Sequence, residues 1–600
     1  MSPLDPISYN VRFPDAARNF AEISASFPVP DASRVELSMA VWTPGSYLIR
    51  EYSRHLDRVR ARTSGTPEGS SQELPIRKLS KNRWEVECGD AKRITVDYRV
   101  FGHEMSVRAN WIEEGFALIN GAPTFLTLTE DLMTDSPVDR VHEIEISLPE
   151  GWETVVTSLP AVDAESTRFR AANFDELVDS PFLAGCPHVD EFEAGDRNHV
   201  VAHEGGGGIW DEEASSRDVA KIVETQQAFW GTVPYERYVF FNLITESGGG
   251  LEHKDNCVLM TSRWKYRRRE SYLDWLGLVS HEFFHTWNVK RLRPIELGPF
   301  DYENENYSRS LWVAEGVTNY YTDMLVLRAG LCSETEYLEK LSKFFERLHR
   351  TPGRLEQTLE ESSFDAWIKL YRPDENSANS GISYYVKGAV VAFLLDVEIK
   401  RHTEDAKCLD DVLRESFQRY SGDRGFQGEE FCALASEIAE HDLTSWFDRA
   451  LRSTEDLSYE GALDYLGLRF RDSERKKASP PAAWVGIGTR VDDEGRLMIR
   501  QVRTDSPAAQ AGLNVHDEIL AIDDFRIEPR RWEKRLKQYS PGDRVRFLLA
   551  RRQSLRTIEV ELGTKPDEKW KLECDPECSP EAEKRRATWL SAPNQGASEE

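Results

Sequence analysis

The chain has 600 residues, more than one hydrophobic core covers, so its length predicts about four domains of ~150 residues each. It carries 76 Lys and Arg against 104 Asp and Glu, a net charge of −28, and such a surface repels phosphate backbones and anionic lipid. Nucleic acid and membrane partners are therefore disfavoured, whereas the hydrophobic content of 40% suffices for packed cores and excludes a mainly disordered chain.

The cysteines and the N-terminal sequence bear on the compartment. The sequence begins without a basic segment followed by an apolar run, and no stretch of about 18 apolar residues occurs further on. The eight cysteines are scattered, and the one close pair, Cys574 and Cys578, lacks the second pair that a four-ligand zinc site needs. We therefore expect free thiols and a cytoplasmic location.

Residues 1–187 predict an N-terminal β domain. Short alternating runs such as Val35–Val41 and Arg93–Val100, separated by Pro, Gly and Asp, are typical of antiparallel strands. The stretch 64–71, rich in Gly, Ser, Pro and Glu, predicts an exposed hairpin loop inside this domain.

Residues 188–475 predict a mostly helical domain. A helix is expected over Arg217–Trp230 and a strand over Tyr238–Ile244, and helical periodicity dominates from Tyr272 to about Leu466.

The C-terminal part begins after a charged, Pro-containing linker at residues 476–481. Short strand-like runs over residues 482–565 predict a small third domain. Residues 566–600 form a charged tail in which Trp570 and Trp589 could act as anchors.

The segment His281-Glu282-Phe283-Phe284-His285 carries the strongest chemical signal. It follows the periodic run of residues 272–279, so it should lie within a helix, where histidines four residues apart share one face. Two such imidazoles suit one tetrahedral Zn²⁺, and Glu282 is then beside the metal as a base for its water.

A catalytic zinc needs a third protein ligand, and Glu315 is the candidate. Its context, Leu311 to Tyr321, is apolar, so an unpaired carboxylate there would be costly to bury and a metal would supply the missing partner. Glu303 and Glu305 are nearer to His285 in the sequence, but they lie in a polar stretch and are more simply solvated.

These residues resemble the gluzincin metallopeptidases and, among them, the PDZ-containing glycyl aminopeptidase family. The segment Trp42–Arg50 resembles the signature of that family's N-terminal β domain. Ser247–His253 resembles the glycine-rich strand of aminopeptidases, in which the Glu, here Glu252, holds the α-ammonium group of the substrate. Tyr385–Gly388 resembles a Y-x-K-G segment whose Tyr stabilises the tetrahedral intermediate, although the adjacent Tyr384 leaves the assignment open by one position.

The residues themselves support part of this interpretation. Glycines such as Gly249 and Gly250 let a backbone approach a ligand closely, and Glu252 at their edge is placed to pair with a cation. A glycine-rich turn with a solvated Glu is the alternative.

Residues 484–488 and 506–523 resemble a PDZ domain of the bacterial protease type. The resemblance implies a loop that offers N–H groups to a peptide C-terminus, and a sheet edge to which an extended peptide adds. A packing module that binds nothing is the alternative. The basic run Arg263–Arg269 is most simply a solvated loop, although it could attract a substrate carboxylate.

The sequence thus predicts a multidomain α+β protein: an N-terminal β-sandwich-like domain, a thermolysin-like catalytic domain with a helical lobe, and a C-terminal PDZ domain. The predicted function is that of an aminopeptidase with one Zn²⁺ held by His281, His285 and Glu315, acting on peptides with Gly or Ala, by resemblance, at the N-terminus. A zinc endopeptidase is one alternative. A peptide-binding adaptor with structural zinc is the other, but such a site is closed by four protein ligands and has no use for the base Glu282.

Overall fold

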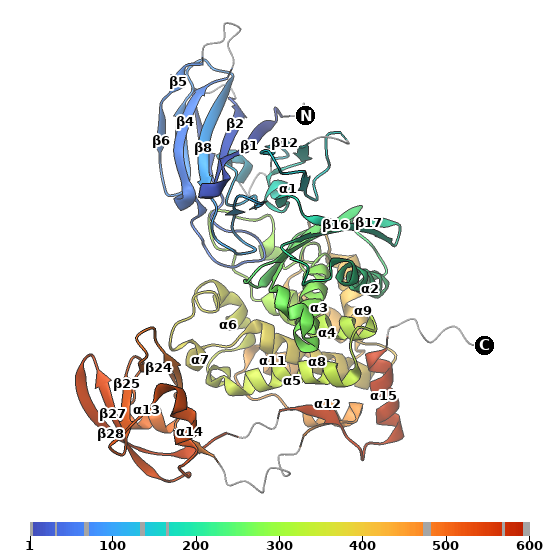
Figure 1. Cartoon of the computed structure of the whole chain (residues 1–600). Coiled ribbons are helices and arrows are strands. Elements are labelled where there is room, and N and C mark those ends of the chain that lie inside the picture. Colours follow the sequence, from blue (N-terminus) through green and yellow to red (C-terminus); the bar gives the residue numbers. More distant parts are fainter. Residues whose placement is uncertain are drawn as a thin grey trace.

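A computed structural model describes residues 4–29, 33–64, 71–132, 138–163, 167–471, 482–566 and 570–591. A β-rich N-terminal region, a mostly helical middle region and a β-rich C-terminal module follow one another along the chain (Figure 1). This order is the one expected from the sequence. The predicted linker at 476–481 lies outside the described residues.

The N-terminal region packs a large sheet against smaller ones. The large sheet has the strand order β14-β12-β1-β2-β8-β4-β5, and two four-stranded sheets have the orders β13-β15-β10-β9 and β11-β3-β7-β6. Strands from all three sheets contribute to one hydrophobic core. The strands of the large sheet are β1 (Ile7–Asp15), β2 (Phe20–Pro28), β4 (Leu56–Thr63), β5 (Glu73–Leu74), β8 (Arg93–Phe101), β12 (His142–Ser147) and β14 (Arg168–Ala171). Those of the small sheets are β3 (Arg34–Ser38), β6 (Ile76–Lys78), β7 (Arg83–Glu87), β9 (Trp111–Ile112), β10 (Ala117–Ile119), β11 (Thr127–Leu128), β13 (Thr154–Val156) and β15 (Phe182–Gly185).

Two details of this region qualify the prediction. The pairing is antiparallel except between β1 and β12, which run parallel, because the chain makes a long excursion before β12 returns beside β1. Most of the predicted hairpin loop lies outside the described residues, but β4 and β5 on its two sides do pair antiparallel.

The middle region begins with a five-stranded sheet of order β16-β17-β18-β20-β19, in which β19 (Gly249–Glu252) is an edge strand antiparallel to β20 (Asn256–Thr261). The remaining strands are β16 (His188–Ala194), β17 (Arg197–Glu204) and β18 (Arg237–Ile244). The predicted helix at Arg217 starts earlier, at Glu212, because Asp211 caps its first turn by accepting a hydrogen bond from the Ala214 N–H.

Helices α2 to α12 form the rest of the middle region and share one large core with its sheet. These are α2 (Glu212–Trp230), α3 (Arg269–Phe284), α4 (Thr318–Arg328), α5 (Glu334–Arg350), α6 (Leu359–Phe364), α7 (Ser377–Ser380), α8 (Tyr384–His402), α9 (Leu409–Tyr420), α10 (Gly428–Ile438), α11 (Thr444–Arg452) and α12 (Glu460–Leu466). Trp42 and Tyr47 from the N-terminal region are buried in the same core, so the Trp42–Arg50 segment fastens the first region to the second.

The C-terminal module has its own core under a sheet of order β23-β24-β25-β27-β28. Its elements are β22 (Ala483–Trp484), β23 (Ile487–Val491), β24 (Leu497–Val502), α13 (Pro507–Ala511), β25 (Glu518–Ile522), β26 (Phe525–Arg526), α14 (Trp532–Leu536), β27 (Arg544–Arg551), β28 (Ser554–Glu561) and β29 (Gly563–Thr564).

The tail after this module returns to the middle region (Figure 1). Strand β30 (Leu572–Cys574) pairs with β21 (Leu468–Phe470), and helix α15 (Pro580–Leu590) follows. Both suggested anchors are in contact there: Trp570 stacks on His349 with ring centroids 3.5 Å apart, and Trp589 is 1% exposed.

Two further expectations can be compared with the structure. All eight cysteines lie within the described residues and all are free thiols, as predicted. Among the helices that the structure describes, none is long and apolar enough to cross a membrane.

Candidate metal centre and active site

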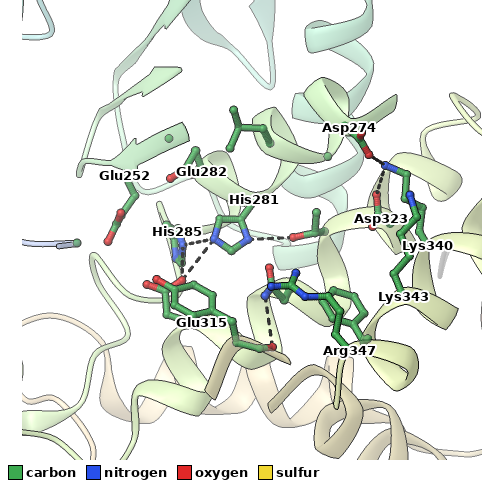
Figure 2. A pocket seen from close by; sticks show the side chains of 18 of the residues that line it. Glu252, Asp274, His281, Glu282, His285, Glu315, Asp323, Lys340, Lys343 and Arg347 are labelled. Atoms are coloured by element: carbon green, nitrogen blue, oxygen red, sulfur yellow. Dashed lines mark hydrogen bonds and ion pairs between the residues drawn. The ribbon is translucent and has the colours of Figure 1, made fainter. Parts of the chain in front are cut away.

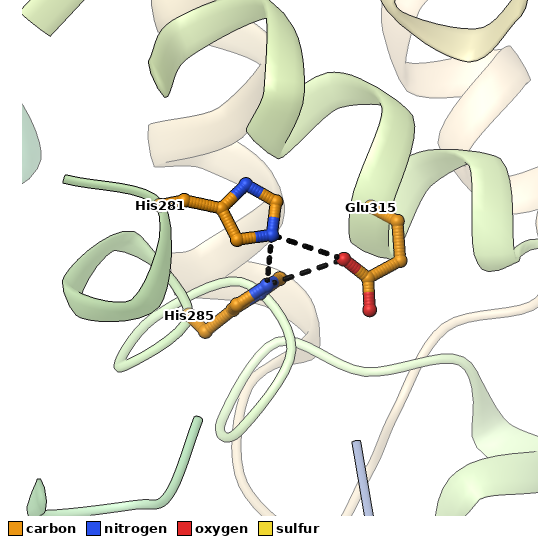
Figure 3. A group of neighbouring side chains, drawn as sticks. All are labelled: His281, His285 and Glu315. Atoms are coloured by element: carbon orange, nitrogen blue, oxygen red, sulfur yellow. Dashed lines mark hydrogen bonds and ion pairs between the residues drawn. The ribbon is translucent and has the colours of Figure 1, made fainter. Parts of the chain in front are cut away.

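Three side chains from two helical segments converge in the middle region (Figure 3). His281 lies in the last turn of α3 and His285 immediately follows that helix, whereas Glu315 lies in the π-helical turn η6 (Trp312–Val317) just before α4. The two Nε2 atoms are 3.0 Å apart, and Oε2 of Glu315 lies 3.4 Å from Nε2 of His281 and 3.2 Å from that of His285. The structure thus brings the three predicted ligands together.

Hydrogen bonds fix the tautomer of both rings. Nδ1 of His285 lies 2.8 Å from the Asn288 carbonyl, which can only accept. Nδ1 of His281 lies 3.1 Å from Oγ1 of Thr322, whose own proton is donated to the Thr318 carbonyl. Each Nδ1 is therefore the protonated nitrogen, and each Nε2 lone pair points into the cluster, as outer hydrogen bonds arrange metal-binding histidines elsewhere.

The donor set fits a tetrahedral metal ion. Bonds of about 2.0–2.1 Å at tetrahedral angles place ligand atoms about 3.3 Å apart, and the three separations here are 3.0, 3.2 and 3.4 Å. Oε2 of Glu315 is buried and has no hydrogen-bond partner among the described residues, a costly arrangement that a cation would relieve. The rival Glu303 instead pairs with Arg83 of the N-terminal region.

Glu282 lies beside this cluster, packed against the edge strand. A Cβ built on Gly250 would lie 2.6 Å from Cγ of Glu282 and closer still to its carboxylate, so only glycine fits at that position. Burial raises the pKa of the Glu282 carboxyl, and the carboxylates of Glu252 and Glu315 raise it further against the opposing effect of His285. A carboxylate held in this way accepts a proton more readily than one in water.

Glu252 ends the edge strand β19 with its side chain turned into the site. It is 4% exposed, and its Oε1 is buried without a hydrogen-bond partner in the described part of the chain. Carboxylate oxygens of Glu252 and Glu282 and a ring nitrogen of His285 all lie within 4.8 Å of one another. Two buried carboxylates at this spacing repel each other, so the site favours a bound cation.

The N-terminal region closes this end of the site. Gly45, from the Trp42–Arg50 segment, has φ of +85°, and a Cβ there would lie 2.6 Å from Cδ of Glu252. Glycine is therefore required at position 45 both by the backbone and by the close approach of the carboxylate.

Tyr385, not Tyr384, lies on the wall of the cleft. Tyr385 lines it, and its hydroxyl is 3.1 Å from the hydroxyl of Tyr371. Tyr384 is 0% exposed, is absent from the lining, and stacks against Tyr385 with ring centroids 4.7 Å apart. Burial, followed by the nearby Glu315, raises the pKa of Tyr385 well above its usual value, so its hydroxyl keeps the proton that a hydrogen bond requires.

The cleft that contains these groups has a volume of 540 Å³ and includes residues that the sequence did not reveal (Figure 2). Arg108 reaches it from the N-terminal region, with Nη2 3.4 Å from the Gly250 carbonyl. Lys340, Lys343 and Arg347 reach it from α5. Neither Gly249 nor any residue of the basic run Arg263–Arg269 is among its described lining residues.

Models of known families match most of the chain. The M61 glycyl aminopeptidase model matches residues 274–391, the peptidase M61 N-terminal domain model matches residues 8–186, and a PDZ domain model matches residues 465–562. A comparison with the curated proteins found no match.

Among solved structures, the chain resembles an aminopeptidase N family protein from Idiomarina loihiensis with 28% identity and a TM-score of 0.88, over 97% of this chain and 100% of that one. An M1 zinc metallopeptidase from Deinococcus radiodurans aligns with 12% identity and a TM-score of 0.46, over 76% of this chain and 95% of that one.

Proposed function

The chain belongs to the M61 glycyl aminopeptidase family and is a metallo-aminopeptidase, and from this premise we propose which residues carry the reaction. His281, His285 and Glu315 would hold one zinc ion. A zinc ion there supplies a Lewis acid that polarises the scissile carbonyl and lowers the pKa of water. The substrates are peptides with a free N-terminus, with Gly or Ala as the suggested first residue.

The protein's own groups then divide the remaining work. The Glu282 carboxylate takes a proton from the attacking water and passes it to the leaving amine. The Tyr385 hydroxyl donates a hydrogen bond to the oxygen on which negative charge develops. The Glu252 carboxylate accepts hydrogen bonds from the α-ammonium group of the substrate, which places the first peptide bond at the metal centre.

One observation carries the exopeptidase proposal: Glu252 presents a buried carboxylate oxygen without a described partner, at the end of the edge strand and beside Glu282. A substrate ammonium group would satisfy that oxygen and would balance the two carboxylates. Gly45 packed against Glu252 supports the same proposal, because it closes the side on which an endopeptidase would need room for upstream residues.

The test compares tetrapeptides that differ only in a free or acetylated N-terminus. The free peptides should be preferred by more than about tenfold in kcat/KM, because the acetylated ones leave Glu252 buried and unpaired. Glu252→Ala should remove most of this preference and retain the metal. Internal cleavage of acetylated peptides at rates equal to those of the free ones would replace the exopeptidase by the endopeptidase. A chain that binds metal and hydrolyses neither would support the adaptor.

The C-terminal module is proposed to bind a peptide C-terminus. Its strand β23 lies at one end of the sheet order, so one of its edges has no partner within that sheet. An extended peptide could add there. The cytoplasmic location remains a prediction from the sequence.

A further inference from the structure

The cleft continues beyond the metal centre to a wall of basic side chains on helix α5. Lys340, Lys343 and Arg347 are three and four residues apart, so they share one helix face, and all three line the cleft. In Figure 2, Glu252 lies on one side of the histidines and these three residues lie on the opposite side. A basic wall is notable in a chain with a net charge of −28.

The three cations differ in how far their charge is already balanced. Lys340 contacts Asp274 and lies 3.9 Å from Asp323, so two carboxylates neutralise it. Lys343 pairs with Glu270 at 3.1 Å, but both side chains are largely exposed and such a pair is weak. Arg347 has no carboxylate partner among the residues that the structure describes, although its guanidinium borders the cleft.

The direction of the substrate follows from the proposed function, on which this inference rests. If the ammonium group is held at Glu252 and the first carbonyl lies at the metal centre, an extended peptide continues toward the opposite side, where Arg347 lies (Figure 2). Leu278 and Phe344 give this part of the cleft apolar lining. A residue after the scissile bond therefore meets apolar surface together with an unbalanced guanidinium.

We propose that Arg347, assisted by Lys343, forms a subsite that reads a carboxylate on the leaving side of the substrate. The guanidinium is planar and binds a carboxylate through two parallel hydrogen bonds, whereas a lysine contributes a point charge. The carboxylate can be the C-terminus of a short peptide or an acidic side chain. The enzyme is then selective at both ends: Glu252 reads the ammonium group and Arg347 reads the carboxylate.

The test measures kcat/KM for cleavage of the first bond in pairs of peptides with free N-termini. One pair is Ala-Ala-Ala as the free acid and as the C-terminal amide, and the other is Ala-Asp-Ala amide and Ala-Asn-Ala amide. We expect a preference of about tenfold for the carboxylate member of at least one pair, mainly through KM and decreasing at high salt. The pair that shows it identifies the source of the carboxylate.

Variants assign the preference to the arginine. Arg347→Gln should bring the ratio close to one by lowering kcat/KM of the carboxylate member, and Arg347→Lys should keep only part of it. Arg350→Gln removes a charge from the same helix but from a side chain outside the described cleft lining, so it should keep the full ratio. An equal loss for both members of a pair in Arg347→Gln would indicate a structural role and would overturn the subsite.

The failure of this inference can be distinguished from that of the proposed function. Alanine p-nitroanilide has a free amine and no carboxylate, so its hydrolysis reports the aminopeptidase reaction alone. Hydrolysis of the anilide together with ratios near one in both wild-type pairs overturns the subsite and leaves the aminopeptidase intact. Failure to hydrolyse the anilide and all four peptides overturns the proposed function itself.

Discussion

Gly250→Ala tests whether the position of Glu282 matters as much as its chemistry. A Cβ on residue 250 would lie 2.6 Å from Cγ of Glu282, and ordinary contact between carbon atoms needs about 3.5 Å. Because Gly250 belongs to a paired strand and Glu282 ends in a flexible side chain, the side chain should give way, by about 1 Å. Displacements of about 1 Å in a catalytic group can cost about 100-fold in rate, equivalent to about 2.7 kcal/mol.

Gly248→Ala is the matched control. It lies two residues away in the same glycine run, but a Cβ there would meet only the Met260 carbonyl, at 3.9 Å. Gly249 is unsuitable as a control, because its φ of +126° would strain any other residue. The expected result is therefore a sharp difference between two neighbouring substitutions that add the same methyl group.

The assay measures kcat with alanine p-nitroanilide, zinc content by mass spectrometry and the unfolding midpoint for both variants. Gly250→Ala should lose about 100-fold in kcat and retain full zinc content and most of its stability, whereas Gly248→Ala should match the wild type. Wild-type kcat in Gly250→Ala would refute the reasoning, since Glu282 could then leave its observed position at no cost.

Three further predictions concern the ligands, the tyrosines and the tail. Glu315→Ala should lose zinc, whereas Glu282→Gln should keep zinc and lose at least about 100-fold in kcat; loss of zinc in Glu282→Gln would make that residue a ligand. Tyr385→Phe should lower kcat by about 100-fold with little change in KM, and Tyr384→Phe should not; the reverse pattern would move the role by one residue. Trp589→Ala should lower the free energy of unfolding by about 3–5 kcal/mol, as measured in denaturant, because the ring is fully buried; a change below about 1 kcal/mol would mean that α15 is not docked.

The sequence revealed the parts of the site that are local in the chain. His281, Glu282 and His285 lie within five residues, and helical geometry alone converts that spacing into a shared face. Glu315 was identified because a carboxylate in an apolar context needs a partner. Its path to the metal was not predictable, because η6 adds a π-helical turn just before α4 and thereby sets the direction of the side chain.

Residues contributed by other parts of the chain carried no comparable signal. Arg108 lies in an irregular segment between β8 and β9, and only the docking of the N-terminal region brings it to the Gly250 carbonyl. Arg347 belongs to an ordinary amphipathic helix whose charged face would be interpreted as solvated. The basic run Arg263–Arg269, which the sequence did single out, lies outside the described cleft lining.

The tail shows how far a composition-based interpretation can mislead about architecture. Because no candidate catalytic residue lies beyond residue 477, cutting the chain there would be expected to remove only a peripheral module. In the structure, however, β30 pairs with β21, and Nε1 of Trp589 donates to the Tyr320 hydroxyl at 2.8 Å and contacts Asp396 at 3.1 Å. Tyr320 belongs to α4, the helix that directly follows the turn carrying Glu315. The C-terminal module is therefore inserted between two segments that complete the helical region, and the tail supports the metal centre from behind without supplying any of its ligands.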